Sequence, residues 1–209
     1  MQRPGAIFPN QSEAPAAIES RALGTLAYIR ASIESSGSMH VPGMAGIVMG
    51  IIGVLAAIVV SMPPCAAHWL GIWLAAAAIA LVLGGALVVR QIVQRGQARY
   101  LGPVRKFLLC LCPALLAGAV LTVVFEAAGE THAIPGMWLL LYGCAVLSAS
   151  TVTIAGIARL ICIMGGLFVA LGLVAFALPA TAHTAMLGLG FGILHIIFGF
   201  LIGRSTHGG

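Results

Sequence analysis

Long apolar runs constrain the fold of this sequence more than any other feature. Six of them stand out, and they cover residues 42–62, 69–89, 107–127, 135–157, 160–178 and 184–203. Each run is close to the roughly 20 residues that a helix needs to cross about 30 Å of hydrocarbon. Spanning segments of this kind are helical because lipid offers no hydrogen-bond partner to a free backbone group. The sequence therefore predicts an all-α fold, an integral membrane bundle of six transmembrane helices.

The scarcity of charge supports the same fold class. Only 7% of the residues are charged, 61% are hydrophobic, and the chain contains no aspartate. A water-soluble domain carries about a quarter charged residues. So few charges could not cover a water-facing surface, which excludes an ordinary soluble domain and makes the lipid bilayer the first partner of the chain.

The basic residues predict the orientation of the bundle. They lie before the first run, between the second and third, between the fourth and fifth, and after the sixth. All ten are Arg3, Arg21, Arg30, Arg90, Arg95, Arg99, Arg105, Lys106, Arg159 and Arg204. In a six-span topology these positions share one side of the membrane, which the positive-inside rule assigns to the cytoplasm. We therefore expect both termini in the cytoplasm, and we assign the net charge of +5 to topology rather than to nucleic-acid binding.

The segments outside the spans are short. Residues 1–12 are predicted to be a disordered tail and residues 204–209 a cytoplasmic tail, on either side of the transmembrane domain at 42–203. Residues 13–37 are predicted to form a cytoplasmic or interfacial amphipathic helix. Its apolar positions fall within an arc of about 80°, and they are Ile18, Ala22, Leu26, Ile29 and Ile33. Such a helix either lies on the membrane or the bundle, or binds a membrane or cytoplasmic protein partner.

Two internal repeats compete in the sequence. "PGMAGIVMG" at 42–50 and "PGMWLLLYG" at 135–143 share the pattern P-G-M-x5-G, which indicates an inverted repeat of three plus three helices. "PCAAH" at 64–68 and "PATAH" at 179–183 share P-x-x-A-H, which indicates parallel hairpin repeats instead. The sequence is compatible with either repeat.

Four stretches carry a resemblance to a known family. They are "LAYIRASIESSG", "VPGMAGIVMG", "IPGMWLLLYG" and, most distinctively, "GLGFGILHIIFGFLIGR". With these motifs the chain resembles a family of small six-helix bacterial inner-membrane proteins from about residue 22 to the C-terminus. The resemblance implies a multi-pass location in the bacterial inner (cytoplasmic) membrane, and it brings no activity, cofactor or catalytic residue with it.

Glycine spacing gives the sixth run a packing face. Gly188, Gly192, Gly199 and Gly203 fall within an arc of about 80° and form two small-xxx-small motifs, which allow another helix backbone to approach closely. His195 lies on the same face near the middle of the run. We therefore expect His195 to point into the bundle.

His195 is the residue in the spans with the most chemistry to offer. An ionisable side chain inside a membrane is a functional-site hypothesis by default. The simplest alternative is an interhelical hydrogen bond to Tyr142 or Ser148 of the fourth run, at comparable depth. A proton relay or ligand contact is the second interpretation. A haem or metal ligand is the third, although no second histidine lies at matching depth in another run.

Three histidines lie in the three segments predicted to face outwards, one in each. They are His68, His132 and His183. If these loops converged, the imidazoles could bind a divalent metal ion. Loop histidines are also commonly solvated or interfacial, so both interpretations are retained.

The chain lacks familiar catalytic motifs. We find no nucleophile–base pair, no HExxH and no phosphate-binding loop. The abundance of packing glycine favours a non-enzymatic regulatory or structural membrane subunit that acts through helix packing and needs no cofactor. The alternative is a small transporter or channel, with an inverted three-plus-three repeat and His195 near its pathway.

Overall fold

A computed structural model of the chain describes residues 21, 23–26, 28, 42–94 and 101–207. The chain divides into two compact units, Met1–Gly37 and Ser38–Gly209, and each is described by itself. In the first unit, the described residues are helical and exposed. The predicted disordered tail at 1–12 and most of the predicted amphipathic helix at 13–37 lie outside the described residues.

The second unit is built from helices. In chain order its elements are α2 (Gly43–Val60), α3 (Pro63–Ala66), α4 (Trp69–Gln94), α5 (Leu101–Ala127), the 3₁₀ helix η2 (Thr131–Ala133), α6 (Ile134–Ser150), α7 (Ala155–Ala177), α8 (Ala180–Leu187), the π-helix η3 (Gly188–Leu194) and α9 (His195–His207). Six helical stretches of the described residues are long and apolar enough to cross a membrane, the sixth running through α8, η3 and α9. The predicted all-helical class is therefore confirmed, with six helices long and apolar enough to span a membrane in the described part of the chain.

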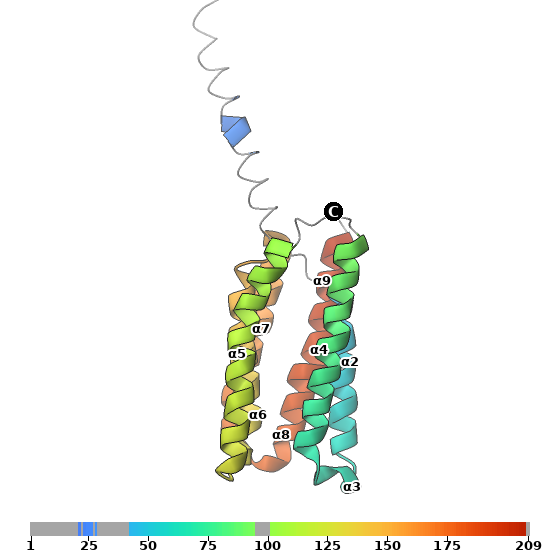
Figure 1. The fold of residues 1–209 in the computed structure, drawn as a ribbon, viewed down its shortest axis with the longest axis vertical. Coiled ribbons are helices and arrows are strands. Elements are labelled where there is room, and N and C mark those ends of the chain that lie inside the picture. Colours follow the sequence, from blue (N-terminus) through green and yellow to red (C-terminus); the bar gives the residue numbers. More distant parts are fainter. Residues whose placement is uncertain (1–20, 22, 27, 29–41, 95–100, 208–209) are drawn as a thin grey trace, which may run out of the picture. The chain divides into compact units, whose positions relative to one another are not determined.

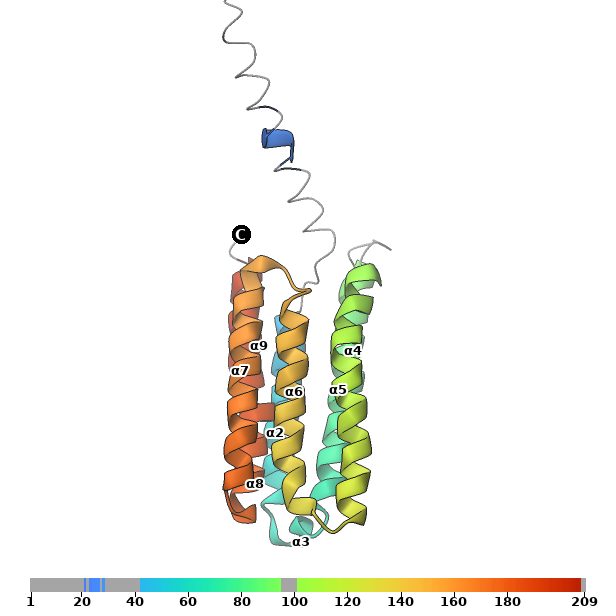
Figure 2. The ribbon, with the colours of Figure 1, turned by 90° about the vertical axis from the view of Figure 1, so that its left-hand side faces the viewer.

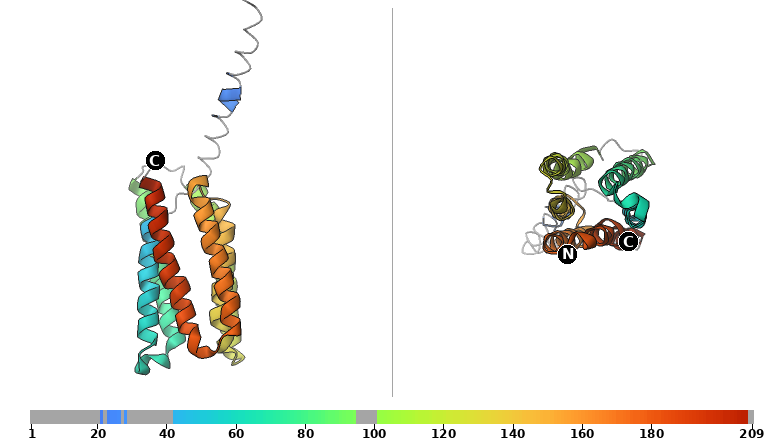
Figure 3. Two further views of the ribbon diagram at one scale, coloured as in Figure 1. Left: turned by 180° about the vertical axis from the view of Figure 1, so that it is seen from behind. Right: turned by 90° about the horizontal axis from the view of Figure 1, so that it is seen from below.

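The spans form three rows of two helices. The middle row is α2 and α6; α4 and α5 lie on one side of it, and α7 and α9 on the other (Figures 1, 2 and 3). Successive spans run in opposite directions, so α4 ends at the end of the bundle where α5 and α7 begin and α9 finishes (Figure 2). The basic residues at these positions gather at one end of the bundle and are exposed: Arg90, Arg105, Lys106, Arg159 and Arg204.

Two helix pairs pack backbone against backbone. A Cβ atom on Gly143 of α6 would lie 2.8 Å from the carbonyl oxygen of Gly165 in α7, and one on Gly172 would lie 2.7 Å from the Leu140 nitrogen. In the second pair, a Cβ on Gly199 of α9 would lie 2.7 Å from the carbonyl oxygen of Gly43 in α2. Real Cβ contacts are longer than this. The two helix pairs can therefore approach each other this closely only because the residues in contact are glycines. Figure 3 shows α9 running alongside α2.

Burial is uneven across the rows. Within an 18-residue window of each span, the share of buried residues is 50% in the fourth span and 44% in the sixth, but 11% in the second and 6% in the third. Phe168 of α7, Leu139 of α6 and Leu187 of α8 form the centre of the core and are almost wholly enclosed. The helices α4 and α5 are therefore a loosely packed flank on a tightly packed frame.

Span boundaries differ from the sequence prediction most clearly at α6. This helix ends at Ser150, not at 157, and α7 already begins at Ala155. The reason lies in the hydroxyls of the stretch "SASTVT" at 148–153, which the run 135–157 includes. Ser150, Thr151 and Thr153 each donate to a backbone carbonyl three or four residues earlier, at 2.7 Å. The Ser148 and Ala149 carbonyls also accept the backbone N–H groups of Thr151 and Val152, so hydroxyls and backbone together satisfy the carbonyls at this helix end. The helix therefore ends where the apolar average of the run alone predicts continuation.

The sixth span contains an unpredicted π-helical stretch. From Gly188 to Leu194 the helix widens before it returns to α-helical geometry at His195. Three of these seven residues are glycines, all of them buried. Wide turns of this kind are rare and often occur at functional sites.

Candidate functional site: a cavity beside His195

His195 is the first residue of α9 and follows the π-helical stretch directly. Its side chain is only 3% exposed. The Nε2 atom lies 2.7 Å from the Tyr142 hydroxyl of α6, and the Nδ1 atom lies 3.4 Å from the carbonyl oxygen of Gly190, five residues earlier. A carbonyl is only an acceptor, so this arrangement favours the tautomer with a proton on Nδ1. Tyr142 then donates its hydroxyl proton to Nε2.

An aromatic shell holds this pair. The rings of Phe168 and Tyr142 meet edge to face with centroids 4.8 Å apart, and Phe168 meets the His195 imidazole in the same way at 5.3 Å. Phe191 of η3 stacks on the imidazole, with centroids 6.2 Å apart and an angle of 20° between the planes. Such offset and edge-to-face contacts stabilise ring pairs and restrict their orientation. The hydrogen-bonded pair is therefore fixed by its surroundings on three helices.

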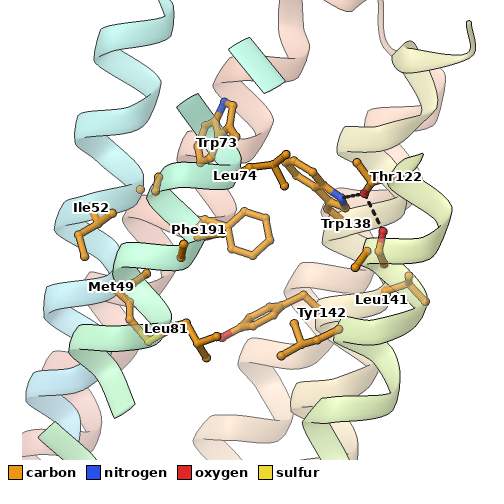
Figure 4. A pocket seen from close by; sticks show the side chains of 18 of the residues that line it. Met49, Ile52, Trp73, Leu74, Leu81, Thr122, Trp138, Leu141, Tyr142 and Phe191 are labelled. Carbon is orange, nitrogen blue, oxygen red and sulfur yellow. Dashed lines mark hydrogen bonds between the residues drawn. The ribbon is translucent and has the colours of Figure 1, made fainter. Parts of the chain in front are cut away.

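A cavity of about 420 Å³ lies beside the pair. Its walls come from α2, α4, α5, α6, η3 and α9, and His195 is among its lining residues. Tyr142 lines it as well (Figure 4). Small side chains line the two outer helices and leave the space open. They are Ala76, Ala77, Ala78 and Ala80 on α4 and Ala114, Gly118 and Ala119 on α5. The volume is within the range of small-molecule sites, roughly 300–1,000 Å³.

A second polar cluster joins α5 and α6 at the cavity wall. The Trp138 indole nitrogen donates to the Thr122 hydroxyl oxygen at 2.8 Å, and Thr122 donates to the Gly118 carbonyl at 2.6 Å (Figure 4). Both hydrogen bonds lie in a region with few other polar groups. The bond from Trp138 joins α6 to α5, whereas the bond from Thr122 to Gly118 lies within α5. The rest of the wall between the two helices is mostly apolar.

The cavity reaches the surface of the bundle along α4 and α5. Three residues that line it are also substantially exposed: Leu74 and Leu81 on α4, at 47% and 65%, and Leu115 on α5, at 42%. In a membrane-spanning bundle, side chains exposed at this position face lipid. The cavity therefore opens towards the hydrocarbon between these two helices.

Of the two hydrogen-bond partners expected for His195, the structure brings Tyr142 to it and not Ser148. Ser148 lies in the last turn of α6, is exposed, and donates to the Cys144 carbonyl at 3.0 Å. Its position near the helix end follows from the early end of α6 at Ser150.

The predicted packing glycines meet α2. A Cβ on Gly188 would lie 2.9 Å from the Ala57 Cβ, and one on Gly192 would lie 2.8 Å from a methyl group of Val54. Gly199 meets the α2 backbone as described above. A Cβ on Gly203 would meet nothing within 4 Å, but one on Gly43 would lie 2.6 Å from the Gly203 nitrogen.

The three outer histidines have separate surroundings. His68 is exposed and directly precedes α4. His132 lies 3.3 Å from the Glu130 carboxylate, and both side chains are exposed. His183 is buried, and its Nε2 donates to the Leu178 carbonyl at 3.2 Å. Among the residues that the structure describes, no group of three or more His, Cys, Asp or Glu could hold a metal ion. The structure does not bring these histidines together.

Several residues of the site were absent from the sequence prediction. The fold is needed to place four of them at the site, because they come from helices far apart in sequence: Thr122, Trp138, Phe168 and Phe191. The tryptophans were the available signal for this site in the sequence. Trp73 and Trp138 line the cavity, and the Trp69 ring lies 6.4 Å from that of Trp138. Trp73 is 4% exposed, and its indole N–H has no hydrogen-bond partner among the described residues.

No protein family, no curated protein and no solved structure matches this chain. What the fold and the site define is a class: a multi-pass helical membrane protein with a buried histidine–tyrosine pair beside an apolar cavity.

Proposed function

We propose that this chain is a non-enzymatic regulatory or structural subunit of the bacterial inner membrane, with both termini in the cytoplasm. The orientation is supported by the exposed basic residues at one end of the bundle, which the positive-inside rule assigns to the cytoplasmic side. The partner is another membrane protein, bound through a helix face in the bilayer.

The observation that carries this proposal is the contrast in burial between the flank and the frame. Only 6% of an 18-residue window of the third span is buried in the chain's own fold, although α5 is 27 residues long. Its most exposed large side chains repeat at intervals of seven, four and three residues, and they are Leu109, Leu116, Val120 and Val123. This spacing keeps them on one face of the helix. Such a stripe can pack against a partner helix as well as against lipid.

Two native cysteines make a matched test of that face. Cys112 on α5 and Cys162 on α7 are both exposed and lie in the first half of their helices. Variants that keep only one of them can be labelled with a photoreactive maleimide in native membranes. We expect the Cys112 variant to give one protein adduct of defined mass, and the Cys162 variant to give none. Lipid adducts alone from both variants would contradict the subunit proposal.

A small transporter or channel is the second candidate, and the packing pattern favours it. The helix α2 packs against α4 and α9, and α6 packs against α7 and α5. Exchanging the first three spans with the last three maps each of these contacts onto another, as an inverted three-plus-three repeat requires. The cavity beside His195 supports the same candidate.

Proton flux into vesicles tests the transporter. Reconstituted protein under an imposed pH gradient should collapse the gradient faster than empty vesicles, and His195→Gln should remove the difference because the amide cannot carry a proton. Equal rates in empty, wild-type and variant vesicles would rule out a proton-linked pathway.

A further inference from the structure

We propose that the cavity between α4 and α5 is a binding site for a lipid-soluble molecule with an apolar body and a hydroxyl group. The hydroxyl donates its proton to the oxygen of Tyr142, and the body lies against the small and aromatic side chains of the walls. This inference goes beyond the proposed function, because a subunit held by helix packing needs no small ligand.

The apolar body follows from the walls. The described lining residues are alanine, glycine, leucine, isoleucine, methionine and aromatic residues, apart from Thr122 and His195. Thr122 already accepts a hydrogen bond from Trp138 and donates one to Gly118. The indole N–H of Trp73, which also lines the cavity, is one donor without a partner among the described residues, and no charged side chain lines the space. A charged or strongly polar ligand would therefore lose its water for few partners in such a site. The aromatic rings of Trp73, Trp138 and Phe191 supply large apolar contact surfaces (Figure 4).

The hydroxyl follows from the direction of the hydrogen bonds. His195 donates from Nδ1 to the Gly190 carbonyl, so its Nε2 accepts the proton of Tyr142. The Tyr142 oxygen has then used its only proton and keeps lone pairs to accept another hydrogen bond. Its ring projects from α6 across the cavity and carries this oxygen at its end (Figure 4). The group that completes the site is therefore a donor such as a ligand hydroxyl.

Access from the bilayer follows from the loose flank. Leu74, Leu81 and Leu115 line the cavity and are also exposed, so a molecule dissolved in the hydrocarbon reaches the site without crossing water. Pro113 lies inside α5, next to the cavity residue Ala114. A proline removes one backbone hydrogen bond from its helix, which allows α5 to bend at the opening.

The three tryptophans of the chain provide the readout. Two of them line the cavity, and the third contacts Trp138. Bromine quenches tryptophan fluorescence at short range, so a bromododecanol and the hydrocarbon probe bromododecane can be compared in phosphatidylcholine vesicles that contain the full chain. We expect saturable quenching by the alcohol at a lower concentration than by the hydrocarbon.

Matched variants assign that difference to the hydroxyl contact. Tyr142→Phe should weaken apparent binding of the alcohol about two- to tenfold, the loss of one hydrogen bond, and leave the hydrocarbon unchanged. Ser148→Ala on the same helix should keep the wild-type preference. An unchanged preference in Tyr142→Phe, or equal quenching by a bromoketone of the same length, would overturn the assignment of a hydroxyl ligand.

A second pair of variants tests the cavity itself. Ala114→Phe fills the space from α5, whereas Ala117→Phe places the same ring on an exposed position that does not line it. Ala80→Phe fills the cavity from α4 and replaces Ala114→Phe if that variant does not fold. Saturable quenching should vanish in the filled variants and persist in Ala117→Phe. Quenching that rises without saturation and equally in all of these proteins would show partition into lipid only, and it would overturn the site.

Discussion

The frame and the flank of this bundle solve the problem of packing in lipid in different ways. In the frame, α2 meets α9 and α6 meets α7 through glycines, so close that a single Cβ atom would overlap a neighbouring backbone. In the flank, α4 and α5 are held mostly by one neighbour each and leave a cavity of about 420 Å³ beside His195. Lipid chains are as apolar as leucine, so helices associate in a bilayer through close contact and hydrogen bonds rather than through hydrophobicity. The same apolar composition therefore gives closely packed helices where glycines align and an open wall where they do not.

The largest expected effect on stability comes from the same leucine-to-alanine change made once in the frame and once in the flank. Leu139 of α6 is fully buried, whereas Leu116 of α5 is 67% exposed. Leu139→Ala should cost about 2–5 kcal/mol because it leaves a cavity in the core. Leu116→Ala should stay within about 0.5 kcal/mol of wild type. Thermal unfolding of the purified proteins in one detergent checks this, and equal losses in both would erase the distinction.

Glycine substitutions at two positions of α7 should change stability in opposite directions. A Cβ on Gly172 would lie 2.7 Å from the Leu140 nitrogen, but one on Gly166 would meet nothing within 4 Å. Gly172→Ala should destabilise the bundle by about 1–3 kcal/mol, because backbone atoms must move apart. Gly166→Ala should stabilise it by roughly 0.5–1 kcal/mol, the helix preference for alanine over glycine. The same melting assay measures both, and a neutral Gly172→Ala would show that α6 and α7 are not in backbone contact.

A smaller effect than those at Leu139 and Gly172 is expected for the hydrogen bond from Tyr142 of α6 to His195 of α9. Tyr142→Phe removes the 2.7 Å contact to His195 and keeps the ring against Phe168. Interhelical hydrogen bonds in membranes contribute about 0.6 kcal/mol on average and up to about 1.7. We expect a loss of stability in that range, with Ser148→Ala as the control that loses less. A loss well above this range would mean that the pair organises the core and does more than link two helices.

The sequence was enough to predict the helical class and the number of spans, because a run of apolar residues is a local property. It was not enough to predict where α6 ends. The hydroxyls of Ser150, Thr151 and Thr153 donate hydrogen bonds to backbone carbonyls of the preceding turn. The average hydrophobicity of a run does not take such bonds into account. Depth in the membrane limited the predicted hydrogen-bond partners of His195 to Tyr142 and Ser148. The choice between them depended on where α6 ends, which places Ser148 in its last turn.

The cavity could not be predicted for a different reason. It depends on Ala80, Ala114 and Gly118, small residues that are ordinary in membrane helices and line one space only after α4 and α5 are placed. The π-helical turn at 188–194 was also invisible. Glycines at these positions fit an α-helix equally well. Only the structure shows that the wider turn places the Gly190 carbonyl beside the His195 imidazole.

The stability of Ala114→Phe relative to Ala117→Phe tests most directly whether the flank encloses real space beside a rigid frame. Both changes add the same ring to α5, but only residue 114 lines the cavity. Filling a cavity commonly stabilises a protein by about 0.5–2 kcal/mol. Our account predicts a higher melting temperature for Ala114→Phe and an unchanged one for Ala117→Phe. A lower melting temperature for Ala114→Phe would mean that the wall is already packed, and it would contradict the account.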